Sequence, residues 1–396
     1  MLAAGCVRLA LSRAALKGMT TNGSRMIEVG PMYLPVATMK ATHGEKYPYM
    51  EPYPYEKKGY GFYKKLVDRT ERRLNENSKV IAVEGNLGVG KHKFAERLAS
   101  EFDLKVFPAT PESVVFTVNG FDYRELSEVL PEGAKPYDMK SLFSDPHPER
   151  GLIGRLQLSW LRAKCSTYVQ ALAHLFHTGQ GVVVVRSPFG DHVFAEAMRE
   201  MGWLTKNYMP FYNEIREAVL AELLRPHLTI YLDAPVTTVK ERLKGRNNPA
   251  EVGSRNLTDK YLMTLEHTYR MSHLPKMRES GEVVEIDWEV EGDDLDMDAI
   301  AEEIAEIKLE GEDNEDLKFQ DWTRLNEDRM IAIRGSYGND SRLDWFFGAR
   351  YPHDCQEILY DPDSAEAIDK IIREHPAIKY QPGTAPEFGY NAMWKI

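Results

Sequence analysis

Cysteine and long apolar runs are both scarce in this chain of 396 residues. The cysteines, Cys6, Cys165 and Cys355, are too few and too widely spaced for a disulfide framework, a structural zinc site or an iron–sulfur cluster. The longest purely aliphatic run is Val182 to Val185, far short of the roughly 20 residues that a membrane-spanning helix needs. We therefore expect a chain of a reducing compartment whose membrane association, if any, is peripheral.

Basic charge is also in deficit, because 50 Lys and Arg stand against 61 Asp and Glu, a formal net charge of −11. This balance excludes binding to nucleic acid through bulk charge. The charge is unevenly placed: no acid precedes Glu28, whereas Lys308 is the single base between Glu285 and Asp316. We expect this acidic window, residues 285–316, to meet either a basic partner or a basic face of the same chain.

The acid-free residues 1–27 are rich in Ala, Leu, Arg and Ser. This composition is typical of a mitochondrial transit peptide, which is recognised as a positive amphipathic helix. A secretory signal is disfavoured because Arg8 and Arg13 interrupt the apolar stretch. The alternative is an ordinary basic N-terminus without a targeting role.

Residues 78–288 carry short apolar segments that alternate with helical patterns. Strands are predicted at residues 79–84, 181–186, 227–232 and 282–287, and helices at 92–102, 151–178, 189–201, 236–243 and 259–278. Such alternation predicts a doubly wound α/β domain, in which a parallel sheet is covered by helices on both faces.

The segments that flank this domain are rich in aromatic residues and lack that alternation. Residues 28–77 alternate Tyr, Pro and Gly, and the close spacing of Pro predicts an extended arm. Residues 289–396 open with an acidic helix, in which Ile300, Ile304 and Ile307 stand at helical spacing, and continue as an aromatic-rich extension. Two interpretations stay open: the extensions dock onto a partner, or they dock back onto the central domain.

A Gly-rich loop follows the first predicted strand and precedes the first predicted helix. Its sequence, Gly85-Asn-Leu-Gly-Val-Gly-Lys-His92, matches the G-x-x-x-x-G-K phosphate loop. The position after the lysine normally holds Ser or Thr, whose hydroxyl ligates Mg²⁺, and the imidazole of His92 is a poor substitute for it. We therefore expect phosphate binding without the usual metal ligand, carried by Gly85, Asn86, Gly88, Gly90 and Lys91.

On these motifs the chain resembles the deoxyribonucleoside kinase family over about residues 79–287. The resemblance implies a five-stranded parallel sheet of the P-loop nucleoside and nucleotide kinase type. Glu112, in Pro111-Glu-Ser-Val, matches the family's general base. Gln157 matches the glutamine that reads the nucleobase. The alternatives are a solvated loop glutamate for Glu112 and a helix-surface amide for Gln157.

Comparison with the family's motifs also shows that parts of its metal and lid sites are missing from this chain. The family's acid at the end of a central strand, which helps to hold the metal, is replaced by Val185, while Arg186 matches the phosphate-contacting arginine. Ser187 and Pro188 also have a purely structural interpretation, because Ser is a favoured N-cap and Pro a favoured first residue of a helix. The lid arginines available are Arg242, Arg246 and Arg255, without the family's compact lid pattern. If each lost metal contact costs about 2 to 3 kcal/mol, turnover falls roughly a thousandfold or more.

Taken with its extensions, the chain resembles a family of accessory subunits of mitochondrial respiratory complex I that have a kinase-like domain. This resemblance implies a non-catalytic subunit on the matrix side of the inner membrane, which supports assembly or stability. Its partners would be other complex I subunits, contacted through the arm and the C-terminal extension. No redox cofactor is implied, and binding of ATP, ADP or a deoxynucleotide is left open. The alternative function is an active kinase that transfers the γ-phosphate of ATP to a deoxynucleoside 5′-hydroxyl.

Overall fold

The computed structural model describes residues 8–9, 38–55, 60, 65, 67–118, 121–145, 150–292, 294–311, 317–337, 355 and 358–375. Apart from the pair Arg8–Leu9, the predicted transit peptide therefore lies outside the described residues, as do residues 28–37 of the arm and much of the aromatic C-terminal extension. No helix in the described ranges is long and apolar enough to cross a bilayer.

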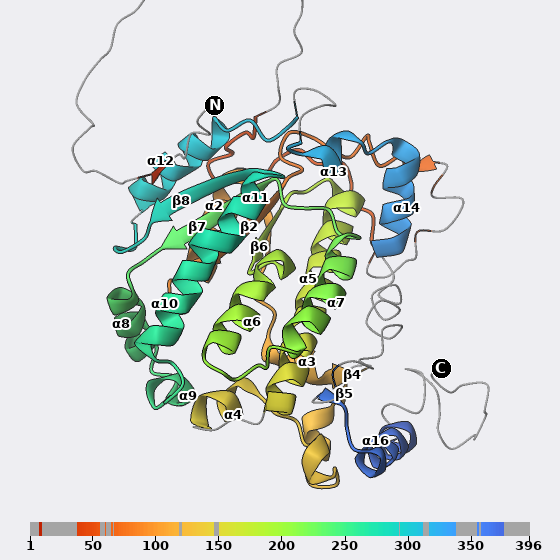
Figure 1. Ribbon diagram of the computed structural model, residues 1–396. Coiled ribbons are helices and arrows are strands. Elements are labelled where there is room, and N and C mark those ends of the chain that lie inside the picture. The colour runs from red at the N-terminus through yellow and green to blue at the C-terminus, as the bar shows by residue number, and fades with distance from the viewer. Residues whose placement is uncertain are drawn as a thin grey trace, which may run out of the picture.

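A parallel sheet forms the centre of the molecule (Figure 1). Its five main strands are, in spatial order, β8 (Glu282–Asp287), β7 (Leu228–Asp233), β2 (Val80–Gly85), β6 (Val182–Val185) and β3 (Lys105–Phe107). The two-residue strand β1 (Arg8–Leu9) pairs with the outer edge of β8. The predicted five-stranded parallel sheet is confirmed, with β1 as an addition.

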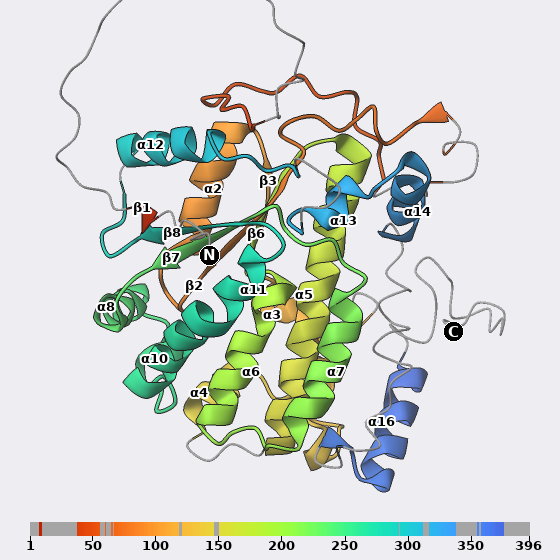
Figure 2. The same ribbon diagram turned by 45° about the horizontal axis from the view of Figure 1, so that its top comes forward.

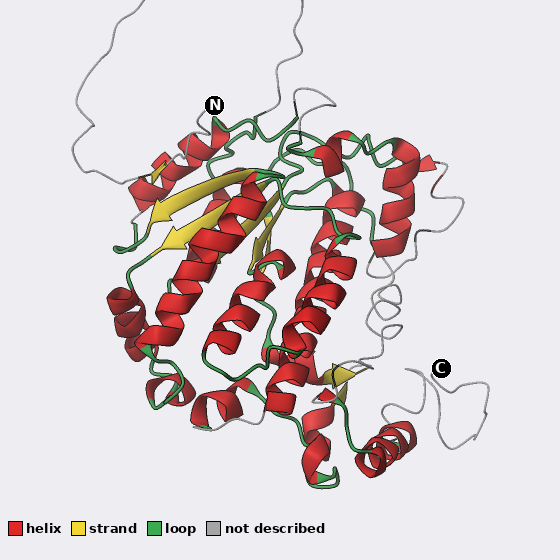
Figure 3. Ribbon diagram, viewed as in Figure 1, coloured by secondary structure: helices red, strands yellow, loops and turns green. Residues whose placement is uncertain are grey.

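Helices cover both faces of this sheet, as the doubly wound pattern predicts (Figure 3). Figure 2 shows α2 (Lys91–Phe102) and α12 (Asp294–Ala305) on one face. The other face carries α5 (Arg150–Thr178), α6 (Asp191–Glu200), α7 (Tyr208–Leu220) and α10 (Asp259–Thr268). The predicted face of α2 is buried, with Phe94, Leu98 and Phe102 at 0 to 1% exposure.

The remaining elements complete the domain and its extensions. They are α3 (Glu112–Phe116), the hairpin β4 (Thr117–Val118) and β5 (Phe121–Asp122), η1 (Tyr123–Leu126), η2 (Glu132–Ala134), α4 (Met139–Ser144), η3 (Pro188–Gly190), α8 (Val236–Arg246), α9 (Pro249–Val252), η4 (Tyr269–His273), α11 (Leu274–Arg278), α13 (Gln320–Thr323), α14 (Glu327–Tyr337) and α16 (Pro362–Glu374). The helix predicted over 259–278 is thus divided by η4, a π-helical turn that precedes Pro275, whose missing N–H cannot continue the α-helical ladder.

The described parts of both extensions fold back onto the domain. The Tyr53 N–H donates to the His177 carbonyl at the end of α5 (3.1 Å), and the Tyr53 and Tyr55 rings stack on the His177 ring at 5.4 and 5.0 Å. Arg334 of α14 enters the same cluster and is fully buried. Of the two interpretations of the aromatic segments, docking onto the central domain therefore describes these parts.

The acidic window also meets its own chain. Glu310 pairs with the buried Lys79 at 2.6 Å, and Glu291 pairs with Lys93 at 2.8 Å. In α12, Ile300 and Ile304 are buried, as their spacing predicts. A basic face of the same chain therefore neutralises part of the window.

Candidate functional site

The Gly-rich loop lies at the carboxyl end of β2 and leads directly into α2. Gly85, Gly88 and Gly90 all have positive φ angles, of 146°, 70° and 87°. A Cβ at Gly85 would lie 2.8 Å from the Leu232 carbonyl oxygen of β7, so only glycine fits there. The loop therefore has the backbone geometry of a phosphate-binding turn at the positive end of a helix.

Lys91, the lysine of this motif, is turned onto its own loop. Its side chain is buried, and Nζ donates to the carbonyl oxygens of Asn86 at 2.5 Å and Gly85 at 3.2 Å. Burial, followed by the charge of Arg186, holds the pKa of Lys91 well below its usual value. The lysine thus lies in the loop with backbone partners in place of a phosphate.

Asn86 and Arg242 hold the loop in position. Asn86 Nδ2 donates to the Leu262 carbonyl of α10 at 3.0 Å, and its Oδ1 accepts the Leu87 N–H at 2.8 Å. Arg242 donates to the Val89 carbonyl at 3.3 Å and to the Trp288 carbonyl at 2.9 Å. Both side chains therefore bind protein groups in this structure.

The second lid arginine, Arg246, is half exposed and pairs with Glu251 at 2.7 Å. Its charge also helps to lower the pKa of Lys91, after burial and Arg186.

His92 and Val185, which stand at the metal-ligand positions of the resembled family, carry no side-chain oxygen. The His92 side chain is 52% exposed and lies 3.7 Å from Glu96, one turn along α2. Val185 is buried at the end of β6. Within the described ranges no cluster of three His, Cys, Asp or Glu residues is placed to hold a metal ion.

Glu84 and Arg186 lie beside the loop. Glu84 is 1% exposed and accepts the Ser187 N–H and hydroxyl, both at 2.8 Å, and the Tyr269 hydroxyl at 3.2 Å. Burial raises the pKa of Glu84, although the Ser187 hydrogen bonds and the nearby Arg186 oppose this shift. Arg186 has a left-handed φ of 63°, a strained conformation of the kind that occurs at ligand sites. Its guanidinium lies 4.7 Å from the centre of the Phe194 ring.

Gln157 lies in a buried polar network and not at the helix surface, so that alternative is wrong. Its amide donates to Asp191 at 2.7 Å. Lys164 and the Tyr212 hydroxyl reach the same carboxylate at 2.5 and 2.6 Å, and Asp191 is fully buried. Lys164 also lies over the Phe194 ring, on which Arg186 packs. The network therefore continues the polar cluster around Lys91.

Among the described residues, no hydrogen bond joins Glu112 to this cluster. Its Oε1 accepts the Met139 N–H at 2.7 Å, and Oε2 lies 3.7 Å from Arg124. It is neither a solvated loop residue nor bonded to the phosphate loop. It joins α3 to the start of α4.

The structure thus brings Lys91, Arg186 and Gln157 into one buried strip along the carboxyl ends of β2 and β6. The residues that connect them, Glu84, Lys164 and Asp191, were not predicted from the sequence. A signal existed for Lys164, which follows Gln157 by seven residues and so lies on the same face of α5. The strip offers cationic groups to a phosphate, but its two buried carboxylates, of Glu84 and Asp191, are each occupied by three protein donors.

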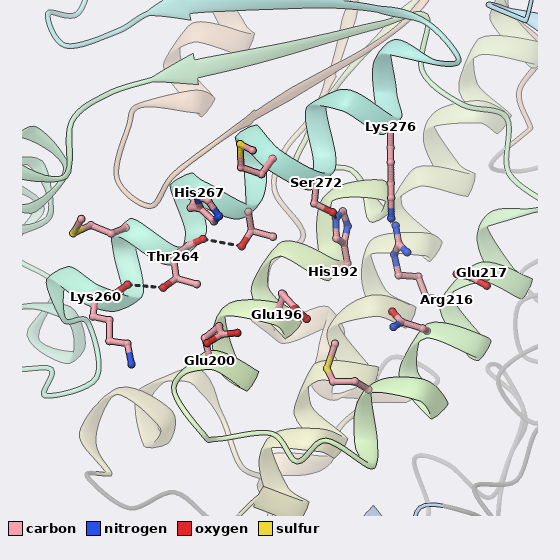
Figure 4. Close-up of a pocket in the computed structure, with 15 residues that line it drawn as sticks. His192, Glu196, Glu200, Arg216, Glu217, Lys260, Thr264, His267, Ser272 and Lys276 are labelled. Atoms are coloured by element: carbon pink, nitrogen blue, oxygen red, sulfur yellow. Dashed lines mark hydrogen bonds between the residues drawn. The ribbon is translucent and has the colours of Figure 1, made fainter.

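A separate cavity of about 940 Å³ opens between α6, α7, α10 and α11 (Figure 4). None of the phosphate-loop residues lines it. It is therefore a second concave feature, distinct from the candidate nucleotide site.

Comparison with known proteins agrees with this geometry. The deoxynucleoside kinase family profile matches residues 81–309. The mouse protein named NADH dehydrogenase [ubiquinone] 1 alpha subcomplex subunit 10, mitochondrial, is 34% identical over 83% of this chain and 87% of its own length. The bovine protein of the same name is 30% identical over 83% of this chain and 90% of its own. A deoxyguanosine kinase of Dictyostelium discoideum is 27% identical over 57% of this chain and 69% of its own. On its sequence and its α/β architecture, this chain belongs to the deoxynucleoside kinase family.

Proposed function

We propose that this chain is a non-catalytic accessory subunit of mitochondrial respiratory complex I, the NADH:ubiquinone oxidoreductase, which it helps to assemble or stabilise. The observation that carries the proposal is the extent of the similarity. The mouse protein named as a subunit matches 83% of the chain, beyond the kinase-like residues 81–309, whereas the Dictyostelium kinase matches 57%. The similarity therefore includes regions that a kinase of this family does not need.

The phosphate-loop region supports the non-catalytic part of this proposal. Phosphoryl transfer depends on Mg²⁺ and on cations positioned around the transferred group. Here Lys91 binds its own loop, His92 faces solvent and Val185 offers no ligand. Active kinase chemistry is correspondingly the weaker interpretation.

In this proposal the subunit is peripheral, on the matrix side of the mitochondrial inner membrane, and contacts other complex I subunits. In addition to their contacts within the chain, the arm and the C-terminal extension supply part of that interface. A nucleotide, ATP, ADP or a deoxynucleotide, binds at Gly85–Lys91 with Arg186 and Arg246 and is not turned over. The redox chemistry belongs to other subunits.

Complementation tests the proposal. The full chain is expressed in cells that lack their own subunit 10, and mitochondrial membranes are separated by native electrophoresis. We expect the chain to co-migrate with complex I and to restore the amount of assembled complex. A chain that stays in the soluble matrix fraction while complex I is absent would contradict the proposal.

Nucleotide binding is tested separately by thermal unfolding with millimolar ATP, ADP or deoxynucleotides, because a ligand that binds only the folded state raises its melting temperature. We expect an increase in the native chain and a smaller one in Lys91→Met. Equal melting temperatures with and without every nucleotide would remove the bound nucleotide from the proposal and leave the accessory role standing.

A further inference from the structure

The cavity between α6, α7, α10 and α11 is lined by methionines and by charged side chains of both signs. Met263 and Met271 lie along its α10–η4 wall and are 60% and 67% exposed. At its other end Arg216 of α7 faces α11, from which the Lys276 side chain extends toward it (Figure 4). The cavity is thus a groove with exposed thioethers at one end and two cations at the other.

Arg216 is buried without a counter-charge. It is 8% exposed, its Nη2 donates to the Phe189 carbonyl at 3.3 Å, and its Nε has no hydrogen-bond partner within the described part of the chain. An unpaired buried guanidinium is costly, and two cations that face each other repel. Arg216 and Lys276 therefore form an unsatisfied site for an anion.

The other titratable residues of the groove do not supply that anion. Glu196 pairs with Arg199 at 2.7 Å, and Glu200 also pairs with Arg199. No ion pair joins Glu217, Glu196 or Glu200 to Arg216 or Lys276 among the described residues. His192 Nδ1 donates to the Phe189 carbonyl oxygen at 3.1 Å, and its Nε2 shares a hydrogen bond with the Ser272 hydroxyl at 3.3 Å.

The histidines near this pair add no charge of their own. Burial, followed by Arg216, holds the pKa of His192 well below its usual value and lowers that of His273 to about 3. Both imidazoles are therefore neutral at physiological pH, and the positive charge at this end of the groove comes from Arg216 and Lys276, whereas Lys260 lies on the α10 wall.

We infer that this groove is the docking site for an acidic segment of another subunit, whose carboxylate lies between Arg216 and Lys276 and whose neighbouring apolar side chain packs on Met263 and Met271. The inference rests on the proposed accessory function. A protein segment is favoured over a small anion because the groove is much larger than one anionic group and the methionines add flexible apolar surface. The carboxylate supplies the charge that the buried guanidinium lacks.

Zero-length cross-linking of the assembled complex tests the contact. A carbodiimide joins a lysine amine to a carboxylate only where the two already touch, and peptide mass spectrometry identifies both residues. We expect Lys276 to be joined to an Asp or Glu of another complex I subunit. Cross-links of Lys276 only to a second copy of this chain, only to acids of its own chain, or to no residue would each overturn the inference.

Charge reversal gives an independent readout. Lys276→Glu places a carboxylate beside Arg216, so the folded chain should be as stable as the native one while the groove no longer accepts an acid. We expect about tenfold less of this variant in the assembled complex. The matched control is Lys140→Glu, the same change at an exposed position of α4.

Equal incorporation of both variants would overturn the inference. If the native chain itself failed to join complex I, the accessory function would fail first, so the two failures are distinguishable. Melting temperatures of both purified variants show whether a loss of incorporation comes from misfolding.

Discussion

The two ends of the central sheet have opposite characters. At the amino ends of the strands, the extensions are tied to the domain: the Trp322 and His227 rings contact each other, tilted by 32° with their centres 4.0 Å apart, and the Phe319 N–H donates to the Ser280 carbonyl at 2.9 Å. At the carboxyl ends, the phosphate loop and its neighbours bond mainly to one another. Ligands of open α/β sheets bind at the carboxyl ends, so this chain keeps the architecture of a ligand site while much of its added sequence is attached at the opposite end.

One buried cation, Arg334, connects three segments near the amino ends of the strands. Arg334 donates to Asp68 Oδ2 at 2.7 Å and to His177 Nδ1 at 2.8 Å, and it lies 4.0 Å from the centre of the Tyr60 ring. These contacts join the arm, α5 and helix α14 of the C-terminal extension. By contrast, Lys91 at the carboxyl end contacts only its own loop through hydrogen bonds. The comparison indicates that folding now depends on the amino end more than on the lysine of the phosphate loop.

The largest expected effect is at Arg334. Arg334→Leu removes the donor to the buried His177 and one of the two arginines that pair with Asp68, which keeps Arg73 at 2.7 Å, and we expect the free energy of unfolding to fall by about 3 kcal/mol. Urea unfolding of the full chain measures this. Arg329→Leu, at an exposed position of the same helix, should change it by less than about 0.5 kcal/mol. Similar losses in both variants would break the comparison.

The next effect is a pH dependence that originates at His177. Burial, followed by Arg334, lowers the pKa of His177 to about 3, whereas the unfolded chain binds a proton at this residue below about pH 6.5. Because only the unfolded state takes up that proton between these values, stability falls as the pH falls. From pH 7 to pH 5 the loss attributable to His177 is about 2 kcal/mol.

His177→Gln sharpens this test. The variant is less stable at both pH values, but its loss between pH 7 and pH 5 should be smaller than that of the native chain by about 2 kcal/mol. Asp68 does not contribute in this range, because its lowered pKa costs stability only below about pH 4. Equal losses in both proteins would show that His177 is not held neutral.

A smaller effect is expected in the acidic window. Glu310→Gln removes the partner of the buried Lys79, and since Glu310 itself is 43% exposed, we expect a loss of about 1 kcal/mol. Glu302→Gln on the exposed side of α12 is the matched control, with a change of less than about 0.5 kcal/mol. Urea unfolding at low salt measures both, and identical values would show that the Lys79 pair adds nothing.

The smallest effect is expected at the phosphate loop. Lys91→Met removes a desolvated ammonium and keeps most of the apolar stem, so the free energy of unfolding should change by less than about 1 kcal/mol in either direction. The same urea experiment as for Arg334 provides the measurement. A loss of more than about 3 kcal/mol would give the carboxyl end the same weight as the amino end.

The sequence predicted the strands that are continuous apolar runs and missed the elements that are not. Strands β2, β6, β7 and β8 were located within one or two residues. The edge strand β3 has only three half-buried residues, so no run marks it. Helix α7 was missed because Pro210 and a mixture of aromatic and polar residues obscure its period.

The candidate site, too, was predicted from the sequence only in part. Motif spacing located the loop and Lys91 because those residues are contiguous in the chain. It did not locate Asp191, which lies 34 residues from Gln157 and meets it only through the packing of α6 against α5. The inward turn of Lys91 was also beyond prediction, because a motif specifies residue types and not the partners that a side chain binds.

Turnover of the purified chain tests the central claim most directly, namely that the carboxyl end keeps the kinase architecture without its chemistry. The full chain is incubated with ATP, Mg²⁺ and each deoxynucleoside, and formation of the monophosphate is followed. We predict turnover at least about a thousandfold below the roughly 1 to 100 per second of typical kinases. Turnover of about one per second with any deoxynucleoside would contradict the account.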